Sequence, residues 1–203
     1  MRYAVWDIET TGFSPEKDAV IEIGVMTMDG DQRETKNWLL NHNIEIPEKI
    51  TELTSITKDM IDAEGVQPAL ALAEFANIIK EHDINVTHNG ISFDIPFIMN
   101  SMAKHSELTT DECAELNAHI IKTAIDTMVI VKGRKLKMTQ ENGEQFRHFA
   151  RRVLAVPPQK GIKSNLTLTC EEYGVEMNEE TRHRALGDVI LTEQVYRKLT
   201  KQA

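Results

Sequence analysis

The sequence predicts an α/β fold in which helices cover both faces of a mixed sheet. Short runs of aromatic and β-branched residues fill much of the first forty positions, and the pair Asp29-Gly30 marks a hairpin between two of them. From residue 84 the pattern changes to strand, loop and helix, which is typical of strands that run parallel. Three antiparallel strands followed by parallel strands are therefore expected in one sheet.

The expected strands are short, and turn residues bound each of them. A Thr-Thr-Gly break and a polar stretch follow the first strand, and the hairpin signal follows the second. A later apolar run ends at the sequence His-Asn-Gly. The strands are expected over residues 3–8, 20–28, about 34–40 and 84–87, and the segment 124–131 is apolar as well.

Capping and stop residues mark the expected helices. Thr57 can cap a short helix, and Pro68 opens a longer one, because proline suits the first turn of a helix. Another helix begins at about Phe93 or Asp94, where apolar residues recur at helical spacing. Two more helices are expected over 165–173, where Gly174 ends the helix, and over 184–199.

The composition predicts one domain. The chain has 203 residues, 41% of them hydrophobic, so residues 1–203 can bury one sizeable core. The net charge of -9 excludes a uniformly basic coat for nucleic acid. Cys113 and Cys170 lack the spacing of a disulfide framework or a zinc site, so free thiols in a reducing compartment are expected. The sequence shows neither a signal peptide nor a membrane span, so we expect a cytoplasmic protein with no membrane partner.

The charge balance inverts between residues 132 and 163. This segment carries nine Lys or Arg residues and two Glu residues, and a basic insertion is expected at about 133–160. Within it, apolar residues at helical spacing predict a helix that ends before Pro157. Arg147, Arg151 and Arg152 lie on or beside the opposite side of that helix. Contact with nucleic-acid phosphates and a merely solvated surface both fit this pattern.

Two carboxylates at the end of the first strand predict a metal site. Asp7 and Glu9 are two residues apart, and side chains alternate along a strand, so both point to the same side of the sheet. Two like charges held together call for a cation, and hard oxygen ligands suit Mg²⁺ or Mn²⁺. The pattern Asp-x-Glu is common by itself. Here the turn Thr10-Thr11-Gly12 follows directly, and it offers hydroxyl and N–H groups to an anion beside the metal.

A second group of candidate residues lies near the end of the chain. His183 and Asp188 are five residues apart, or about 140° around a continuous helix, so they would not converge within one regular helix. We therefore expect His183 in the turn before the helix and Asp188 inside the helix. This arrangement places a mobile imidazole next to a fixed carboxylate.

Three sequence motifs resemble those of the DEDDh (DnaQ-like) 3′→5′ exonucleases. The motifs are WDIETTG at 6–12, HNGISFD at 88–94 and HRALGD at 183–188, in that order and spacing. Further similarity lies in IPEKITELTSIT, AIDTMVI and NLTLTCEEYGVE. Arg184 occupies the place four residues before Asp188, which disfavours the tyrosine variant of the family. The resemblance implies a ribonuclease-H-like fold with a mixed five-stranded sheet flanked by helices.

The resemblance also implies the roles of individual residues. Four carboxylates would hold two Mg²⁺ or Mn²⁺ ions, and His183 would act as general base. Hydrolysis with two metals would release nucleoside 5′-monophosphates from a 3′ end. The metal carboxylates would be Asp7, Glu9, Asp94 and Asp188, and the residues touching the substrate would be Thr10, Thr11, Gly12, Phe13, Leu53, Asn89 and Phe93. The charge pattern of the basic insertion, not the resemblance, adds Arg147, Arg151 and Arg152 as candidate substrate residues.

Several alternatives stay open at the level of sequence. The substrate is expected to be a single-stranded or frayed DNA 3′ end, with an RNA-trimming enzyme as the alternative. A catalytically silent nucleic-acid-binding subunit is a rival in another class, although all five expected catalytic residues are present. A replication or repair polymerase is a candidate partner. Since the chain ends soon after its last helix, we expect a free-standing enzyme or a trimmed domain.

Overall fold

A five-stranded mixed sheet forms the centre of the molecule. The computed structural model describes residues 2–178 and 182–201. The strand order is β3-β2-β1-β4-β5; β1, β2 and β3 pair antiparallel, whereas β4 and β5 run parallel to β1. The strands are β1 (Arg2–Thr10), β2 (Val20–Asp29), β3 (Gln32–Leu39), β4 (Asn85–Thr87) and β5 (Ala124–Asp126). The predicted fold class is confirmed.

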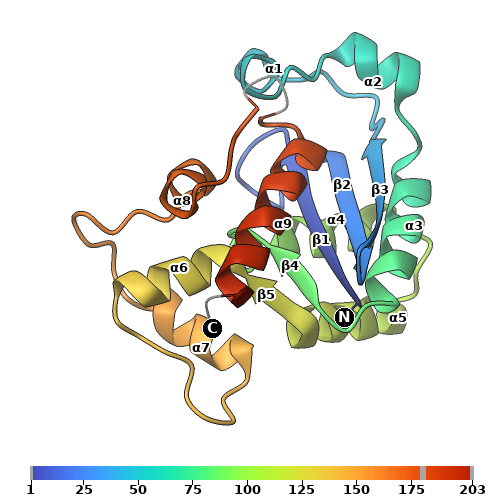
Figure 1. Ribbon diagram of the computed structural model, residues 1–203. Helices are drawn as coiled ribbons and strands as arrows, with labels where there is room; N and C mark the ends of the chain where they lie inside the picture. The colour runs from blue at the N-terminus through green and yellow to red at the C-terminus, as the bar shows by residue number, and fades with distance from the viewer. Residues whose placement is uncertain (1, 179–181, 202–203) are drawn as a thin grey trace.

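Helices cover both faces of this sheet, as Figure 1 shows. The last helix, α9, packs on one face, while α3, α4 and α5 form the layer on the other. The helices are α1 (Glu48–Thr54), α2 (Lys58–Glu64), α3 (Pro68–Lys80), α4 (Asp94–His105), α5 (Thr110–Thr123), α6 (Thr127–Lys135), α7 (Phe146–Leu154), α8 (Leu166–Tyr173) and α9 (Ala185–Lys201). In the part of the chain that the structure describes, no helix combines the length and apolar character needed to cross a membrane.

The alternation of side chains along β1 decides which residues meet which helices. Trp6 and its neighbours two positions away pack into the core with α3, α4 and α5. Tyr3 and Val5 pack on the other face, where Tyr196 of α9 lies edge-on to Tyr3 at 5.3 Å between ring centroids. Asp7 and Glu9 continue this second row. The carboxylates therefore face the side of the sheet that α9 covers.

Three elements differ from what the sequence suggested. No helix was expected over Glu48–Thr54, which forms α1. The helix α5 was not expected, because its sequence is mostly polar and Leu116 and Ile120 are its only buried residues. The apolar segment 124–131 divides into β5 and the start of α6, and the Asp126 side chain caps α6. The other predicted helices are confirmed, including the cap by Thr57 and the stop at Gly174.

The basic segment forms a packed helix. Phe149, Ala150 and Val153 of α7 are buried against α6, where Gly133 allows close approach: a Cβ atom there would lie 2.7 Å from the Phe149 ring. The helix predicted over this segment is confirmed. That residues 1–203 form one exonuclease domain with an insertion stays a prediction, and so does the cytoplasmic location.

Candidate active site

Three carboxylates converge where the central strand β1 ends. Asp7 and Glu9 come from β1, and Asp188 comes from the first turn of α9. One ligand atom of each lies within 4.8 Å of the others. The strand pairing slips directly after Glu9, which lies opposite Glu22, whereas Thr10 lies opposite Val20. Such a bulge turns the chain away from the regular sheet just past the carboxylates.

Asp94 lies next to this group but not within it. It is the first residue of α4, is 3% exposed, and is the largest electrostatic influence on Asp7. Asp126 fixes the turn before α4, because its carboxylate accepts hydrogen bonds from the backbone N–H groups of Asn89 and Ile91. The predicted position of Asp94 beside the β1 carboxylates agrees with the structure, and its role as a metal ligand stays a prediction.

The carboxylates of this site raise one another's pKa. Burial raises the pKa of Asp7 well above its ordinary value, and the charges of Asp94 and Asp188 raise it further. Burial and the charge of Asp188 raise the pKa of Glu9 to about 8. Burial and the neighbouring Asp126 raise the pKa of Asp94 to about 8. The ionised site therefore carries repulsive free energy that a cation would remove.

The side chains present fit a divalent cation. Oδ1 of Asp188 is buried and, among the residues that the structure describes, has no hydrogen-bond partner. A buried carboxylate oxygen without a partner is costly unless something else binds it. All donors of the group are carboxylate oxygens, the type that hard divalent metals prefer. Asp7, Glu9 and Asp188 would hold the metal, with Asp94 beside them.

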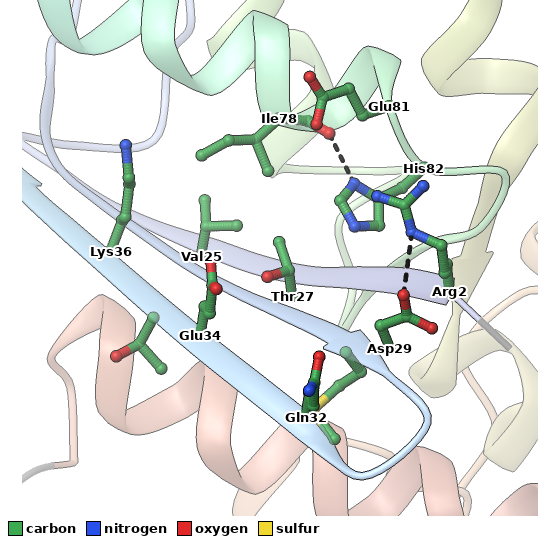
Figure 2. A pocket seen from close by; sticks show the side chains of 12 residues that line it. Arg2, Val25, Thr27, Asp29, Gln32, Glu34, Lys36, Ile78, Glu81 and His82 are labelled. Carbon is green, nitrogen blue, oxygen red and sulfur yellow. Dashed lines mark hydrogen bonds and ion pairs between the residues drawn. The ribbon is translucent and has the colours of Figure 1, made fainter.

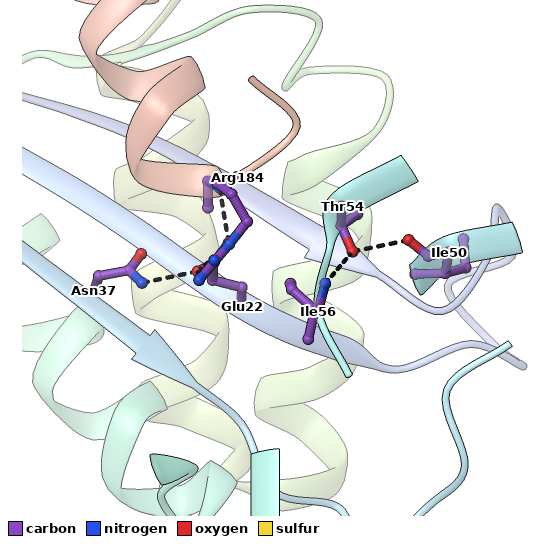
Figure 3. A network of polar contacts seen from close by, with 7 residues as sticks. Glu22, Asn37, Ile50, Thr54, Ile56 and Arg184 are labelled. Carbon is purple, nitrogen blue, oxygen red and sulfur yellow. Dashed lines mark hydrogen bonds and ion pairs between the residues drawn. The ribbon is translucent and has the colours of Figure 1, made fainter. Parts of the chain in front are cut away.

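A buried ion pair docks the start of α9 on the sheet, and the sequence analysis missed it. Glu22 of β2 is fully buried and lies next to Glu9 in the register. Arg184 donates to it from Nε at 3.1 Å and from Nη2 at 2.5 Å (Figure 3). The backbone N–H of Ala185 and the side-chain amide of Asn37 donate at 2.8 Å each. These donors engage Glu22 fully, so it anchors the helix rather than offering a free metal ligand.

A glycine on the same strand lets α9 approach closely. Gly24 lies opposite Asp7 in the β1–β2 pairing. A Cβ atom at Gly24 would lie 2.6 Å from the backbone nitrogen of Leu186 and 2.7 Å from the carbonyl carbon of Ala185. Any larger residue would push the helix outward. Glu22 and Gly24 together set the position of Asp188 relative to the strand carboxylates.

His183 occupies the turn before α9, where the sequence analysis expected it. Its φ is 57°, an uncommon left-handed conformation for a residue with a side chain. Its backbone N–H acts on the Asp188 carboxylate, so the segment that carries the imidazole lies beside the carboxylates. Arg182 donates from Nη2 to Nε2 of His183 at 3.1 Å, and a guanidinium only donates, so Nε2 carries a lone pair in this arrangement.

The turn after the carboxylates is held by its own side chains. The hydroxyl of Thr10 donates to the Gly12 carbonyl at 2.6 Å, and the hydroxyl of Thr11 accepts from the backbone of Ala19. A Cβ atom at Gly12 would clash with the carboxylate of Asp18. The turn that we expected to meet the substrate is therefore rigid, and its hydroxyl groups already have partners within it.

Two apolar side chains near this turn are exposed rather than packed in the core. Phe13 is 85% exposed, and Phe93 lies beside it at 6.3 Å between ring centroids. Leu53 is 48% exposed on α1, whose end is anchored by Thr54 through hydrogen bonds with Ile50 and Ile56 (Figure 3). Both side chains are therefore accessible to a substrate, and their contact with a base stays a prediction.

The remaining predicted substrate residues lie on two other elements. Asn89 has a φ of 68° and lines a hollow of about 360 Å³ with Ser164 and Asn165. The three arginines of α7 do not share one face. Arg152 is held by Glu144 at 2.7 Å, and this pair lowers the pKa of Glu144 to about 2. Arg147 and Arg151 line a groove on the other side of the helix.

A separate hollow of about 350 Å³ lies at the opposite end of the sheet (Figure 2). Arg2 and Asp29 form an ion pair there at 3.6 Å, and Nδ1 of His82 contacts the carbonyl of Ile78 at 2.7 Å. Arg2 begins β1, whereas the candidate active site lies where β1 ends. This hollow is therefore not part of the active site.

The order of this sheet, with carboxylates gathered at the end of its central strand, agrees with the ribonuclease-H-like fold that the sequence motifs predicted. The chain belongs to the RNase T exonuclease family, since the family model described as Exonuclease matches residues 4–196. Enzymes of this family depend on metal ions, in agreement with the carboxylate group described above. The predicted family is confirmed.

Individual relatives extend this comparison. The chain is 28% identical over 197 residues, 96% of its length, to the PolC-type DNA polymerase III of Ureaplasma parvum, of which it spans 11%. It is 36% identical over 105 residues, 51% of its length, to the 3′-5′ exonuclease DinG of Bacillus subtilis, again 11% of that protein. Its structure matches that of exonuclease I with a TM-score of 0.72 and 16% identity, over 99% of this chain and 41% of the other.

Proposed function

We propose that this protein is a 3′→5′ exonuclease that removes nucleoside 5′-monophosphates from single-stranded or frayed DNA ends. The observation that carries the proposal is the convergence of Asp7, Glu9 and Asp188 within 4.8 Å at the end of β1. Two relatives support the direction and the substrate: one is named a 3′-5′ exonuclease and the other a DNA polymerase. The polymerase relative also makes a replication or repair polymerase a candidate partner.

Two Mg²⁺ or Mn²⁺ ions are proposed as the metals, held by Asp7, Glu9 and Asp188 with Asp94 completing the set. When bound, divalent ions would neutralise charge on the phosphoryl oxygens and lower the pKa of a bound water, so that it can lose a proton and act as the nucleophile. The protein contributes a fixed arrangement of carboxylates, because α9 is docked on Glu22 and Gly24. Preformed geometry of this kind lowers the cost of reorganisation during the reaction.

His183 is proposed to accept the proton from the attacking water at Nε2. That nitrogen carries a lone pair and accepts a hydrogen bond from Arg182 in the structure. A neutral imidazole with a lone pair on Nε2 can take up a proton there. Arg182 must release Nε2 before the transfer, which the position of His183 in a turn outside the helix permits.

The terminal base is proposed to rest between exposed apolar side chains. Phe13, which follows Asp7 and Glu9 in the sequence, forms an aromatic pair with Phe93, which directly precedes Asp94. Leu53 is exposed on α1. Stacking on an aromatic ring stabilises single-stranded nucleic acid by about 1–3 kcal/mol per base. The rigid turn with Thr10, Thr11 and Gly12 would position the end of the strand, and Asn89 would border the neighbouring pocket.

The proposed activity can be tested on matched DNA and RNA oligonucleotides, single-stranded and duplex, with Mg²⁺ or with EDTA. A 5′-labelled DNA strand should shorten stepwise, and a 3′-labelled strand should release labelled mononucleotide at once. Cleavage of a circular single strand would contradict an exonuclease, and stepwise loss from the 5′ end would contradict the direction. If RNA were degraded faster than the matched DNA, the proposed DNA substrate would be wrong and the exoribonuclease alternative would be favoured.

Replacement of His183 by alanine should lower kcat by about 10²- to 10⁴-fold, the usual contribution of a general base. The rise in melting temperature caused by Mg²⁺ or Mn²⁺ should remain, because the carboxylates are intact. His148→Ala, on the exposed surface of α7, is the matched control and should leave both quantities unchanged. Loss of the metal-induced stabilisation in His183→Ala would instead identify the imidazole as a ligand.

A further inference from the structure

An apolar groove runs between α7 and the pair α4 and α5. Its volume is about 710 Å³, within the range of sites that bind ligands. Most of its lining is aliphatic and comes from three helices and the turn before α4. These residues include Ile91, Ile95, Met99, Ile121 and Leu154. Ile121 is 40% exposed, so part of this apolar lining is accessible from the surface.

Two arginines are the only charged groups among the described residues that line this groove. Arg147 and Arg151 are four residues apart on α7 and therefore lie on the same side of the helix. Both are exposed, and neither forms an ion pair with another described residue. Arg152, in contrast, points to Glu144. An apolar groove with two unpaired positive charges thus lies on a chain whose net charge is -9.

The helix that carries these arginines is firmly seated. Phe149 and Val153 on its other side are buried against α6, close to Gly133. The guanidinium groups therefore extend from a fixed backbone, and binding requires little reorganisation of the groove. Arginine and methionine are also enriched at protein interfaces relative to other surface.

We propose that this groove binds an acidic segment of a partner protein that carries adjacent aliphatic side chains. The aliphatic side chains would enter the groove, and the carboxylates would pair with Arg147 and Arg151. Helical segments dock in this way when their apolar residues recur every three or four positions. The charge complementarity is specific, because the groove lining offers two cations and no carboxylate.

The lining favours a peptide over a nucleic acid. Single strands bind where bases can stack on aromatic rings beside a positive groove. The described residues that line this groove are aliphatic or polar and include no aromatic ring. The aromatic pair of exposed Phe13 and half-buried Phe93 lies instead beside the candidate active site. The groove therefore lacks the feature that would hold bases.

The proposal can be tested by fluorescence anisotropy with a short labelled peptide in which pairs of aspartates alternate with pairs of leucine and isoleucine. We expect binding in the micromolar range. Arg147→Glu combined with Arg151→Glu should weaken it about tenfold or more, as should Ile121→Asp. Lys160→Glu, elsewhere in the basic segment, and Leu70→Asp, an exposed leucine of α3, are the matched controls and should change the affinity less than about twofold.

One control peptide and two further measurements define the contrary results. A peptide with serine in place of the aliphatic residues should not bind. If it bound as tightly as the aliphatic peptide, the binding would be non-specific charge attraction and the proposal would be wrong. Absence of binding by the acidic peptide would overturn the proposal. If Ile121→Asp instead abolished binding of a thymidine oligonucleotide, the groove would be a nucleic-acid channel. If it abolished a dimer seen by sedimentation, the occupant would be a second copy. Because peptide binding is measured without turnover, it is independent of the proposed nuclease activity.

Discussion

Replacement of Asp7 by asparagine should abolish nuclease activity and, in buffer with a chelator, raise the melting temperature. The surroundings of Asp7 oppose its ionisation, through burial first and then through the charges of Asp94 and Asp188. Asparagine has nearly the same shape but is neutral, so it removes the repulsion together with the metal ligand. We expect kcat/KM to fall about 10³-fold or more, because removal of one member of a cooperating catalytic group can cost nearly as much activity as removal of the whole group.

The pH dependence of stability provides an independent check. Glu9 has a folded-state pKa of about 8 against an ordinary value of 4.5. A carboxyl group with a raised pKa binds more protons when folded, so its contribution to stability is complete below the ordinary pKa and is lost as pH rises to the folded value. The metal-free protein should therefore lose melting temperature between about pH 4.5 and 8, and Asp7→Asn should lose less.

Metal ions should reverse this loss only where the site is intact. Millimolar Mg²⁺ or Mn²⁺ at pH 8 should raise the melting temperature of the wild-type protein, because ions that bind only the folded state stabilise it. Asp7→Asn should not respond, while Asp83→Asn, an exposed aspartate outside the site, should respond like the wild type. Equal stabilisation of Asp7→Asn and the wild type would refute the metal assignment.

Replacement of Glu22 by alanine should destabilise the protein strongly and also lower its activity well below the melting temperature. The change removes the acceptor for Arg184, Asn37 and the backbone of Ala185. Breaking a buried ion pair from one side costs about 3–5 kcal/mol of unfolding free energy. In a chain of this size each kcal/mol corresponds to about 2–4 °C, so a decrease of about 10 °C is expected.

The loss of activity follows from the position of the pair. In the sequence, Arg184 lies between His183 and α9, which carries Asp188. If the first turn of α9 is no longer anchored to the sheet, the side chains of His183 and Asp188 are both displaced. Arg2→Ala removes an arginine at the other end of β1, whose ion-pair partner Asp29 is 65% exposed, and should cost less than about 1 kcal/mol. Glu22→Gln keeps an acceptor and should recover part of the activity. Unchanged kcat in Glu22→Ala at 25 °C would show that the pair only stabilises the fold.

The sequence predicted the parts of the site that depend on local patterns. Asp7 and Glu9 share a side of the sheet because they are two residues apart, and His183 lies outside α9 because five residues of helix would separate it from Asp188. Glu22 escaped notice because it lies within an apolar strand, and its partner Arg184 is 162 residues away. Likewise α5 has too few apolar positions to show a helical period, and its place becomes clear only from the neighbours that cover Leu116 and Ile120.

The origin of the carboxylates also has a consequence for synthesis in the cell. Asp7 and Glu9 lie in β1, whereas Asp188 lies in α9, so nearly the whole described chain separates the carboxylates in the order of synthesis. A nascent chain can form the antiparallel hairpins early, yet it cannot assemble the complete acidic cluster until α9 has been synthesised. Fragments that end before Asp188 would therefore lack one carboxylate of the proposed metal site.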